Sequence, residues 1–406
     1  MLTPTEALSQ ILAAIEPLGE TEEVALPLAT GRVLAEAPVS DISIPPFRKA
    51  MMDGFALRAA EFEGPRDDQG RIQLNCVGES RAGAPFEGMI LPGHCIEIYT
   101  GAEVPDELDQ VVMVEQSELR ENRVFLSGDA KSSAHIQAPG EILTEGAAPL
   151  AAGRRLSAVD LSVLAAMGAH PLKVHRRVRT AVLTTGDELV PVWEKPERGQ
   201  IREGNTLFLN SRLQDLEHEV VGVGIVPDEE QILLEEFGKL LDEVDCLITT
   251  GGVSMGKYDL VGRVFEQLGV EPRLHKVAVK PGKPIWFGMR GRVPVLGLPG
   301  NPVSSMLGLE LFVRPVLAKL GGATGAELEE RLCTGVWNGR ETRPGDRQHN
   351  LPVRLSQGDD GRTLLEPLAW KGSADIVTVA EAQALAVVPA GTSAKPGDVL
   401  HYRPLG

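Results

Sequence analysis

The feature that most constrains this chain is a glycine-rich segment at residues 248–259, which reads ITTGGVSMGKYD. A short, mostly apolar run at 244–248 suits a buried strand, and apolar residues at helical spacing follow from 260 to 268. A strand, a glycine turn and a helix in this order predict a ligand site at the carboxyl end of a parallel sheet. Gly251 and Gly252 let backbone amides approach an anion, so we expect a phosphate there; the alternative is a tight turn that only requires two glycines.

Polar side chains of the same segment support the ligand interpretation. Thr249, Thr250 and Ser254 provide hydroxyl groups, and Asp259 places a carboxylate at the start of the predicted helix. The segment matches neither the dinucleotide-binding pattern G-x-G-x-x-G nor the P-loop pattern G-x-x-x-x-G-K-S/T. The sequence therefore indicates a phosphate site, with an accompanying metal ion, that belongs to neither of these classes.

Strand and helix patterns alternate from residue 177, which is typical of a mostly parallel sheet covered on both faces by helices. Short strands punctuated by glycine and proline predict β structure before residue 141 and again after residue 322. The predicted fold class is multi-domain α/β and β: a central three-layer α/β domain, a helical N-terminal domain carrying a β insertion, and a C-terminal β module. The expected ranges are 1–52 and 141–176 for the helical N-terminal domain, 53–140 for the inserted β domain, 177–322 for the α/β domain and 323–406 for the C-terminal β domain.

Several helix positions are predicted from local signals. Asn205, Asp228 and Asn301 each precede a helical pattern, so each is expected to cap a helix N-terminus. For Asp228, this structural role is an alternative to a role in the site. A further short helix is expected at residues 31–36.

The charge balance limits the partners of the chain. Its 406 residues include 57 acidic and 40 basic side chains, for a net charge of -17, so nucleic acid is not an expected partner and an anionic ligand needs locally concentrated positive charge. No segment is apolar enough to span a membrane, and the N-terminus lacks a signal-peptide pattern. The four cysteines form no C-x-x-C pair, which argues against a zinc site and fits a reducing compartment. We expect a cytoplasmic protein with no membrane partner.

Polar residues follow four predicted strands of the α/β domain. They are Asp187 with Glu188, Asp228, Ser254 with Asp259, and Asn301. Because the carboxyl ends of parallel strands meet at one rim, these groups are expected to share a cleft. Carboxylates there would repel a phosphate unless a divalent cation lies between them, and Mg²⁺ is the usual choice. The alternative for Asp187 and Glu188 is an ordinary helix start.

A loop rich in lysine and proline at residues 276–284 adds positive charge. Two prolines exclude a helix, so Lys276, Lys280 and Lys283 are expected on a stiff loop that binds anions. The alternative for Lys283 is an exposed surface position. The eight histidines show no metal-ligand spacing.

Six short motifs resemble, in order and spacing, those of the molybdopterin molybdenumtransferase family, the MoeA type that includes the E domain of gephyrin. The motifs are MDGFALR at 52–58, YTGA at 99–102, TGDE at 185–188, TGGVS at 250–254, VKPGKP at 279–284 and GLPGNP at 297–302. The resemblance covers essentially the whole chain. It implies a Mg²⁺-dependent transferase that takes molybdate and adenylylated molybdopterin as substrates, inserts molybdenum at the dithiolene sulfurs and releases AMP. It also implies an elongated homodimer whose partner subunit completes the cleft, and a molybdopterin adenylyltransferase is a further candidate partner.

The resemblance also implies roles for particular residues. The expected catalytic residues are Asp53, Thr100, Glu188, Asp228 and Asp259. The last three are also the expected metal ligands. The expected substrate-binding residues are Gly251, Gly252, Ser254, Lys276, Lys280, Pro299, Gly300, Asn301, Arg347 and Ser373. The alternative for Asp53 is a simple turn residue.

The sequence departs from the family pattern at three places. Ile142 stands where the family has an aspartate, residues 48–50 read RKA instead of DNS, and Pro352 replaces an arginine. Loss of a carboxylate from a metal or oxyanion site removes a ligand and much of the rate. A non-catalytic paralogue that binds molybdopterin or a partner protein is therefore the second hypothesis, and a pyrophosphatase acting on another nucleotide is the third.

Overall fold

The strand before the glycine turn lies inside a six-stranded sheet. The computed structural model describes residues 1–252 and 260–405. In spatial order the strands are β14 (Glu219–Val226), β11 (Arg179–Thr185), β15 (Cys246–Thr250), β19 (Val293–Leu298), β18 (Trp286–Arg290) and β16 (Glu271–His275). The first four strands are parallel, and β18 is antiparallel to both of its neighbours, β19 and β16, so only β18 runs in the opposite direction. The prediction of a mostly parallel sheet is confirmed.

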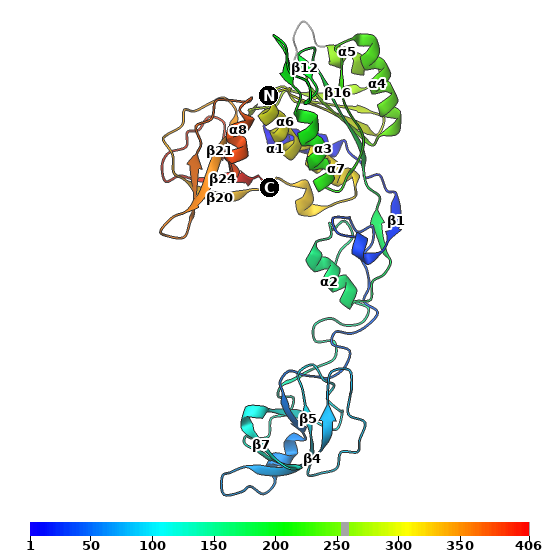
Figure 1. The fold of residues 1–406 in the computed structure, drawn as a ribbon, viewed down its shortest axis with the longest axis vertical. Coiled ribbons are helices and arrows are strands. Elements are labelled where there is room, and N and C mark those ends of the chain that lie inside the picture. The colour runs from blue at the N-terminus through cyan, green and yellow to red at the C-terminus, as the bar shows by residue number, and fades with distance from the viewer. Residues whose placement is uncertain (253–259, 406) are drawn as a thin grey trace.

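Helices cover both faces of this sheet (Figure 1). One face carries α1 (Pro4–Ala13), α3 (Asn205–Asp215), α6 (Pro302–Gly308) and α7 (Arg314–Leu320), and the other carries α4 (Glu230–Glu243) and α5 (Leu260–Gln267). Because neighbouring strand residues point to opposite faces, Ile248 joins the first apolar core and Leu247 joins the second. The three-layer prediction is confirmed.

The β insertion forms its own sheet at the far end of the elongated molecule (Figure 1). Its strands, in spatial order, are β6 (Gln110–Met113), β3 (Gly54–Leu57), β5 (His94–Ile98), β4 (Ile72–Ser80), β8 (Arg123–Leu126) and β7 (Ser117–Arg120). Apolar clusters that contain Ile96 and Phe55 pack on its two faces. The chain enters and leaves side by side, because β2 (Lys49–Ala50) pairs with β9 (Ile136–Gln137).

The C-terminal module is a small closed barrel. Its strands are β21 (Gln348–Gln357), β22 (Thr363–Pro367), β20 (Cys333–Trp337), β24 (Val399–Pro404) and β23 (Ala384–Val388), and a short helix, α8 (Ile376–Glu381), precedes β23. An additional pairing of β21 with β23 closes the ring. The lysine loop joins this barrel to the α/β domain, because β17 (Val279–Lys280) pairs in parallel with β21.

The region between the β insertion and the α/β domain contains little helix. Its elements are β1 (Thr21–Val24), which pairs with β10 (Leu172–His175), and α2 (Ala158–Ala166). The predicted helix at residues 31–36 is wrong: Val33 and Leu34 form β-bridges with Arg155 and Val174, so their backbone bonds with a distant segment instead of within one turn. Within the described part of the chain, no helix combines the length and apolar character needed to cross a bilayer.

Two predicted capping roles are wrong for a shared reason. α4 begins two residues after Asp228, whose carboxylate instead accepts a hydrogen bond from Thr185 Oγ1. Asn205 is the first residue of α3, and its side-chain amide donates to the carbonyl oxygen of Gly300 at 2.8 Å. Asn301 does occupy the N-cap position of α6, although its side chain makes no capping bond. Asp228 and Asn205 therefore bond to polar groups at the strand ends instead of capping their own helices.

A stability prediction follows from the aromatic core under α5. Phe265 is fully buried, with its ring centroid 4.9 Å from that of Phe237 and 5.3 Å from that of Trp286. Phe265→Ala removes this packing and should lower the free energy of unfolding of the α/β domain by about 3–5 kcal/mol. Denaturant unfolding followed by tryptophan fluorescence measures the change. The control Leu207→Ala, at a side chain 65% exposed, should change it by less than about 0.5 kcal/mol; equal losses would contradict this description of the core.

Candidate functional site

The carboxyl ends of three parallel strands are connected by side-chain hydroxyl groups. Thr184 on β11 and Thr250 on β15 share a buried hydrogen bond of 2.7 Å between their Oγ1 atoms. The next residue of β11, Thr185, donates its hydroxyl to the carboxylate of Asp228, which follows β14. These bonds fix the rim of the sheet, as expected where parallel strands end together.

The turn after β15 requires both of its glycines. Gly251 has a φ of 83°, and a Cβ atom there would lie 2.3 Å from the carbonyl oxygen of Thr185. Gly252 has a φ of 64°, and its Cβ would lie 2.3 Å from the side chain of Val261. The N–H of Gly251 donates to the carbonyl oxygen of Leu298 on β19 at 3.2 Å. The turn is therefore held close to two neighbouring strand ends by backbone contacts.

Two of the three expected metal ligands belong to the described residues. Glu188 is exposed just beyond β11, and Asp228 is half-buried beside Thr185. The predictions for Ser254 and Asp259 lie outside the described residues. In the described part of the chain, no three His, Cys, Asp or Glu side chains are close enough to hold a metal together. Two carboxylates still suit the chemistry of Mg²⁺, which usually keeps several waters and takes one or two protein carboxylates.

A groove extends from this rim to the C-terminal barrel. Its main cavity has a volume of about 660 Å³. Five of the expected substrate-binding residues line it: Lys280, Pro299, Asn301, Arg347 and Ser373. A second cavity of about 260 Å³ continues along the barrel and shares Lys280 and Arg347 with the first. Gly251 lines neither cavity, but it lies near this end of the groove: a Cβ on Gly300, between the lining residues Pro299 and Asn301, would be 3.7 Å from its Cα.

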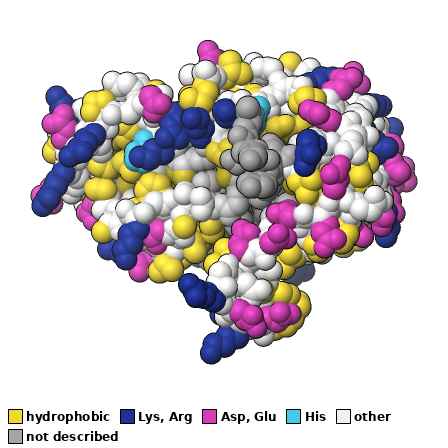
Figure 2. Space-filling view, turned by 90° about the horizontal axis from the view of Figure 1, so that it is seen from above, with side chains coloured by type: hydrophobic (Ala, Val, Ile, Leu, Met, Phe, Trp, Pro, Cys, Tyr) yellow, Lys and Arg dark blue, Asp and Glu magenta, His cyan; other side chains and the backbone are white. Residues whose placement is uncertain are grey.

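The groove is strongly cationic. Among the described residues, five basic side chains and one carboxylate line the two cavities: Lys280, Lys283, Arg343, Arg347, Lys371 and Asp346. Figure 2 shows lysine and arginine side chains gathered in a band beside a histidine on this face of the molecule. This gathering occurs on a chain with a net charge of -17, so the groove meets the requirement for locally concentrated positive charge.

Strand β21 presents alternate side chains to the groove. His349 and Leu351 on the strand line both cavities, as does Arg347 immediately before it, in keeping with the two-residue period of a strand. The strand is fixed against the lysine loop, since Arg347 Nη1 donates to the carbonyl oxygen of Val279 at 3.4 Å and Asn350 Nδ2 donates to that of Lys280 at 3.4 Å. These bonds hold Lys280 of the loop close to Arg347 of the barrel.

The cationic surroundings affect the histidine of this strand. Burial, followed by the positive charges of Lys280 and Arg347, lowers the pKa of His349 to about 4. The imidazole is therefore neutral at pH 7, and it provides a neutral polar group between two permanent cations.

Three other expected residues lie away from the groove. Lys276 has a φ of 73° and its N–H donates to the carbonyl oxygen of Ile285, but it does not line either cavity. Asp53 and Thr100 lie in the β insertion, at the opposite end of the chain (Figure 1). There the N–H and Oγ1 of Thr100 both donate to Asp53 Oδ1 at 2.7 Å, which lowers the pKa of the Asp53 carboxyl. Within one chain, these two residues are not part of the groove.

Sequence reasoning missed several residues that line the groove, including four with aromatic or basic side chains. Arg343, His349, Trp370 and Lys371 were not among the expected site residues, although all four line its cavities. The alternation of Arg347 and His349 on a strand was the signal available for the histidine. The other three lie outside the β-strands, on segments that precede β21 or follow β22, so no periodic pattern identified them.

The departures from the family pattern occupy different environments. The Ile142 side chain is 64% exposed, and its backbone N–H donates to the carbonyl oxygen of Ile44 at 2.9 Å. Pro352 is buried on β21 opposite Leu385 of β23 and does not line the groove. The change at position 142 therefore places an apolar side chain in solvent, whereas the change at position 352 lies within the barrel.

Comparison with known proteins first identifies the class of domain to which the α/β domain belongs. Residues 181–319 match the family model described as a probable molybdopterin binding domain. Residues 2–168 match the MoeA N-terminal region (domain I and II), and residues 336–405 match the MoeA C-terminal region (domain IV). The chain belongs to the molybdopterin molybdenumtransferase, or MoeA, family.

Individual relatives agree with this assignment. The molybdopterin molybdenumtransferase of Haemophilus influenzae is 36% identical, over 79% of this chain and 78% of its own length. That of Nostoc sp. is 32% identical, over 92% of this chain and 86% of its own length. The crystal structure of a molybdopterin biosynthesis MoeA protein from Pyrococcus horikoshii has a TM-score of 0.84 and 26% identity, and the comparison covers 100% of both chains. The predicted fold class and family resemblance are confirmed.

The glycine turn yields a prediction with a control at the same rim. Gly251→Ala forces a left-handed residue with a side chain against Thr185, so it should lower the free energy of unfolding by more than about 1 kcal/mol. Gly300→Ala meets only an ordinary contact at 3.7 Å and should change it by less than about 1 kcal/mol. Denaturant unfolding of both variants measures the difference. Indistinguishable losses would show that the backbone of the turn is not constrained as described.

Proposed function

We propose that this protein inserts molybdenum from molybdate into adenylylated molybdopterin, with Mg²⁺-dependent cleavage of the phosphoanhydride and release of AMP. The observation that carries the proposal is the cationic groove of an otherwise acidic chain, which joins the glycine turn to the barrel. Membership of the molybdopterin molybdenumtransferase family supports a transferase role in molybdenum cofactor biosynthesis.

Molybdate and the phosphates of the nucleotide would bind at different ends of the groove. Lys280, Arg347 and Ser373 line the main cavity on the barrel side and would bind molybdate by charge and by a hydroxyl hydrogen bond. The backbone of the glycine turn, with Asn301, would bind the phosphates of the nucleotide. This arrangement would bring the oxyanion close to the phosphoanhydride on one surface.

The carboxylates at the rim are the candidate ligands of the metal. Glu188, Asp228 and Asp259 would hold Mg²⁺, with water and phosphate oxygens completing its coordination. When bound there, Mg²⁺ supplies charge neutralisation for the phosphates. The hydrogen bond from Thr185 holds the carboxylate of Asp228 in a fixed orientation at the end of its strand.

We also propose a homodimer in which the β insertion of one subunit completes the groove of the other. The reason is the position of Asp53 and Thr100, which lie at the far end of the chain from the groove (Figure 1). The Asp53 carboxylate is already oriented by two hydrogen bonds, so it is prepared to act on a ligand from outside its own sheet. A molybdopterin adenylyltransferase that delivers the substrate stays a prediction.

The central reaction has a direct assay. AMP release from adenylylated molybdopterin should depend on molybdate and Mg²⁺, and Arg347→Gln should lower its rate by roughly 100-fold because it removes charge from the oxyanion site. Arg354→Gln, an exposed arginine further along β21 and outside both cavities, is the matched control and should retain the rate. AMP release that needs no molybdate would favour a pyrophosphatase, and no release from folded protein would defeat the proposal.

The dimer proposal predicts complementation between two inactive variants. Asp53→Asn and Arg347→Gln each damage every site of their own homodimer. If sites are shared, a mixed dimer has one site with both wild-type residues, so subunits mixed at random should recover about a quarter of the wild-type rate. Recovery of no activity, in a mixture where subunit exchange is demonstrated by mass spectrometry, would show that each site is built from one chain.

The second hypothesis, a non-catalytic paralogue, rests on the exposed Ile142. If the chain is an enzyme that has lost one carboxylate, Ile142→Asp should raise the rate of AMP release by roughly tenfold. The isoleucine is exposed, so the substitution should not affect folding, and Val377→Asp, at another exposed apolar side chain, is the control for added charge. No AMP release by either variant would favour the binding protein.

A further inference from the structure

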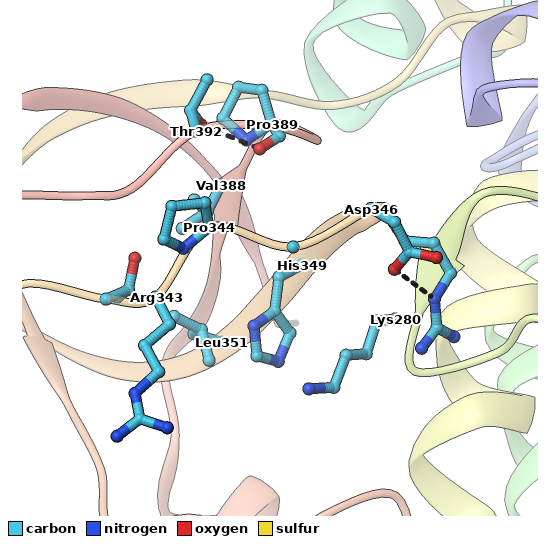
Figure 3. Close-up of a pocket in the computed structure, with 12 residues that line it drawn as sticks. Lys280, Arg343, Pro344, Asp346, His349, Leu351, Val388, Pro389 and Thr392 are labelled. Atoms are coloured by element: carbon cyan, nitrogen blue, oxygen red, sulfur yellow. Dashed lines mark hydrogen bonds and ion pairs between the residues drawn. The ribbon is translucent and has the colours of Figure 1, made fainter.

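His349 lies where the two cavities of the groove meet. It is directly opposite Lys280 of β17 on one side and is paired with β23 on the other, so strand pairing fixes its backbone. Its neighbours in the groove are Leu351 on the same strand and Arg347, which immediately precedes the strand. Figure 3 shows Lys280, Arg343 and His349 extending into the same space. The imidazole is therefore positioned as part of the surface that a bound anion would meet.

The protein leaves hydrogen-bonding atoms at this position unused. Nε2 of His349 is shielded from solvent and has no hydrogen-bond partner among the described residues, and the same is true of Nε1 of Trp370. The two rings are neighbours, with centroids 5.9 Å apart, and both residues line the main cavity. Buried polar atoms in native proteins nearly always have a partner. Both atoms therefore lie behind the wall of the groove, and a bound anion would meet His349 through the part of its side chain that lines the cavity.

The charged groups around His349 disfavour its protonation while the groove is empty. Those lining the cavities are Lys280 and Lys283 from the lysine loop, Arg343, Asp346 and Arg347 from the segment that leads into and begins β21, and Lys371 from the loop after β22. Strand β23, of sequence ALAVV, adds no charge. Asp346 lies 3.4 Å from Arg347 in an ion pair, so the one carboxylate is already partnered. Burial and the cations lower the pKa of His349 to about 4.

We propose that His349 is a further oxyanion-binding residue of the groove, and that its imidazole takes up a proton when a tetrahedral oxyanion binds between Lys280 and Arg347. The inference rests on the proposed function for the identity of the natural oxyanion, molybdate. The proposal adds His349 to the site residues that the family pattern implies, and it couples binding of the anion to uptake of a proton.

The physical reason is a reversal of the local electrostatic potential. A bound dianion offsets the cations that oppose protonation and attracts the imidazolium directly. One unit charge at 4 Å with an effective dielectric constant of 20 changes a pKa by about 3 units. The protonated imidazole of His349, which lines both cavities, then attracts the anion through its positive charge. Binding should therefore strengthen as the pH falls toward the pKa of the empty site.

Calorimetric titration with sulfate tests the proposal on the full chain. Sulfate is the probe because its own charge stays constant between pH 5.5 and 7.5. Titrations at both pH values, each in two buffers of different ionisation enthalpy, give the affinity and the number of protons taken up. The wild-type protein should gain up to roughly tenfold in affinity per pH unit, with proton uptake approaching one per anion at pH 5.5. His349→Gln should bind sulfate at pH 7.5 but lose this uptake and this gain. His401→Gln, in the same barrel on β24 and outside both cavities, should behave as the wild type.

Each other result overturns the proposal. Equal proton uptake by wild type and His349→Gln would show that another group takes up the proton. No proton uptake, or no sulfate binding, by the wild type would show that anion binding is not coupled to protonation of His349. Matching thermal unfolding curves verify folding, and His349→Asn provides a second variant. Molybdate-dependent AMP release by the same preparations separates the two proposals. Release without linked protonation removes only the role of His349, whereas linked protonation without release removes only the proposed reaction.

Discussion

Two residues of the lysine loop, Val279 and Lys280, form a strand with the C-terminal barrel, and the site depends on this pairing. The loop belongs by sequence to the α/β domain, yet its strand hydrogen bonds are made with β21. The pairing brings the cations of the loop beside Arg347 and places both next to the strand ends that carry the glycine turn. Without this pairing, each half of the groove would be an open surface that displays a few exposed cations.

Electrostatics explains why the groove suits an anion. The described lining contains five cations and one partnered carboxylate; the cations repel one another, and an empty groove relieves this repulsion only through solvent. The neutral state of His349 has the same origin, since burial and two neighbouring cations disfavour a further positive charge. A bound oxyanion offsets both the repulsion among the cations and the cost of protonating His349. The acidic remainder of the chain has the opposite effect elsewhere, because it disfavours the binding of polyanions such as nucleic acid to the general surface.

Local sequence signals were sufficient for the parts that depend on neighbouring residues. Strand and helix patterns that alternate from residue 177 predicted the central parallel sheet, and short strands punctuated by glycine and proline predicted both β regions. The failures involve residues far apart in the sequence. Asp228 and Asn205 have the chemistry of helix caps, but each bonds to a group on a different strand end. The segment at 31–36 pairs with residues beyond 150, which no local pattern reveals.

In the candidate site, too, some residues were predicted from the sequence and others depend on contacts between distant segments. The family resemblance identified Lys280, Arg347 and Ser373, which share one cavity, and the lysine-rich loop also pointed to Lys280. His349 has no metal-ligand spacing in the sequence, and its place beside Lys280 results from the pairing of β17 with β21. In the proposed homodimer, the placement of Asp53 relative to the groove depends on the second subunit. The division of the chain into domains at the expected boundaries stays a prediction.

The central claim is that the groove between the glycine turn and the barrel is an oxyanion site. Molybdenum scatters X-rays anomalously, so a crystal soaked in molybdate locates the bound anion without reference to activity. The account predicts an anomalous peak in the main cavity within contact of Lys280 and Arg347. A well-ordered groove that stays empty while molybdate binds elsewhere on the protein would contradict it.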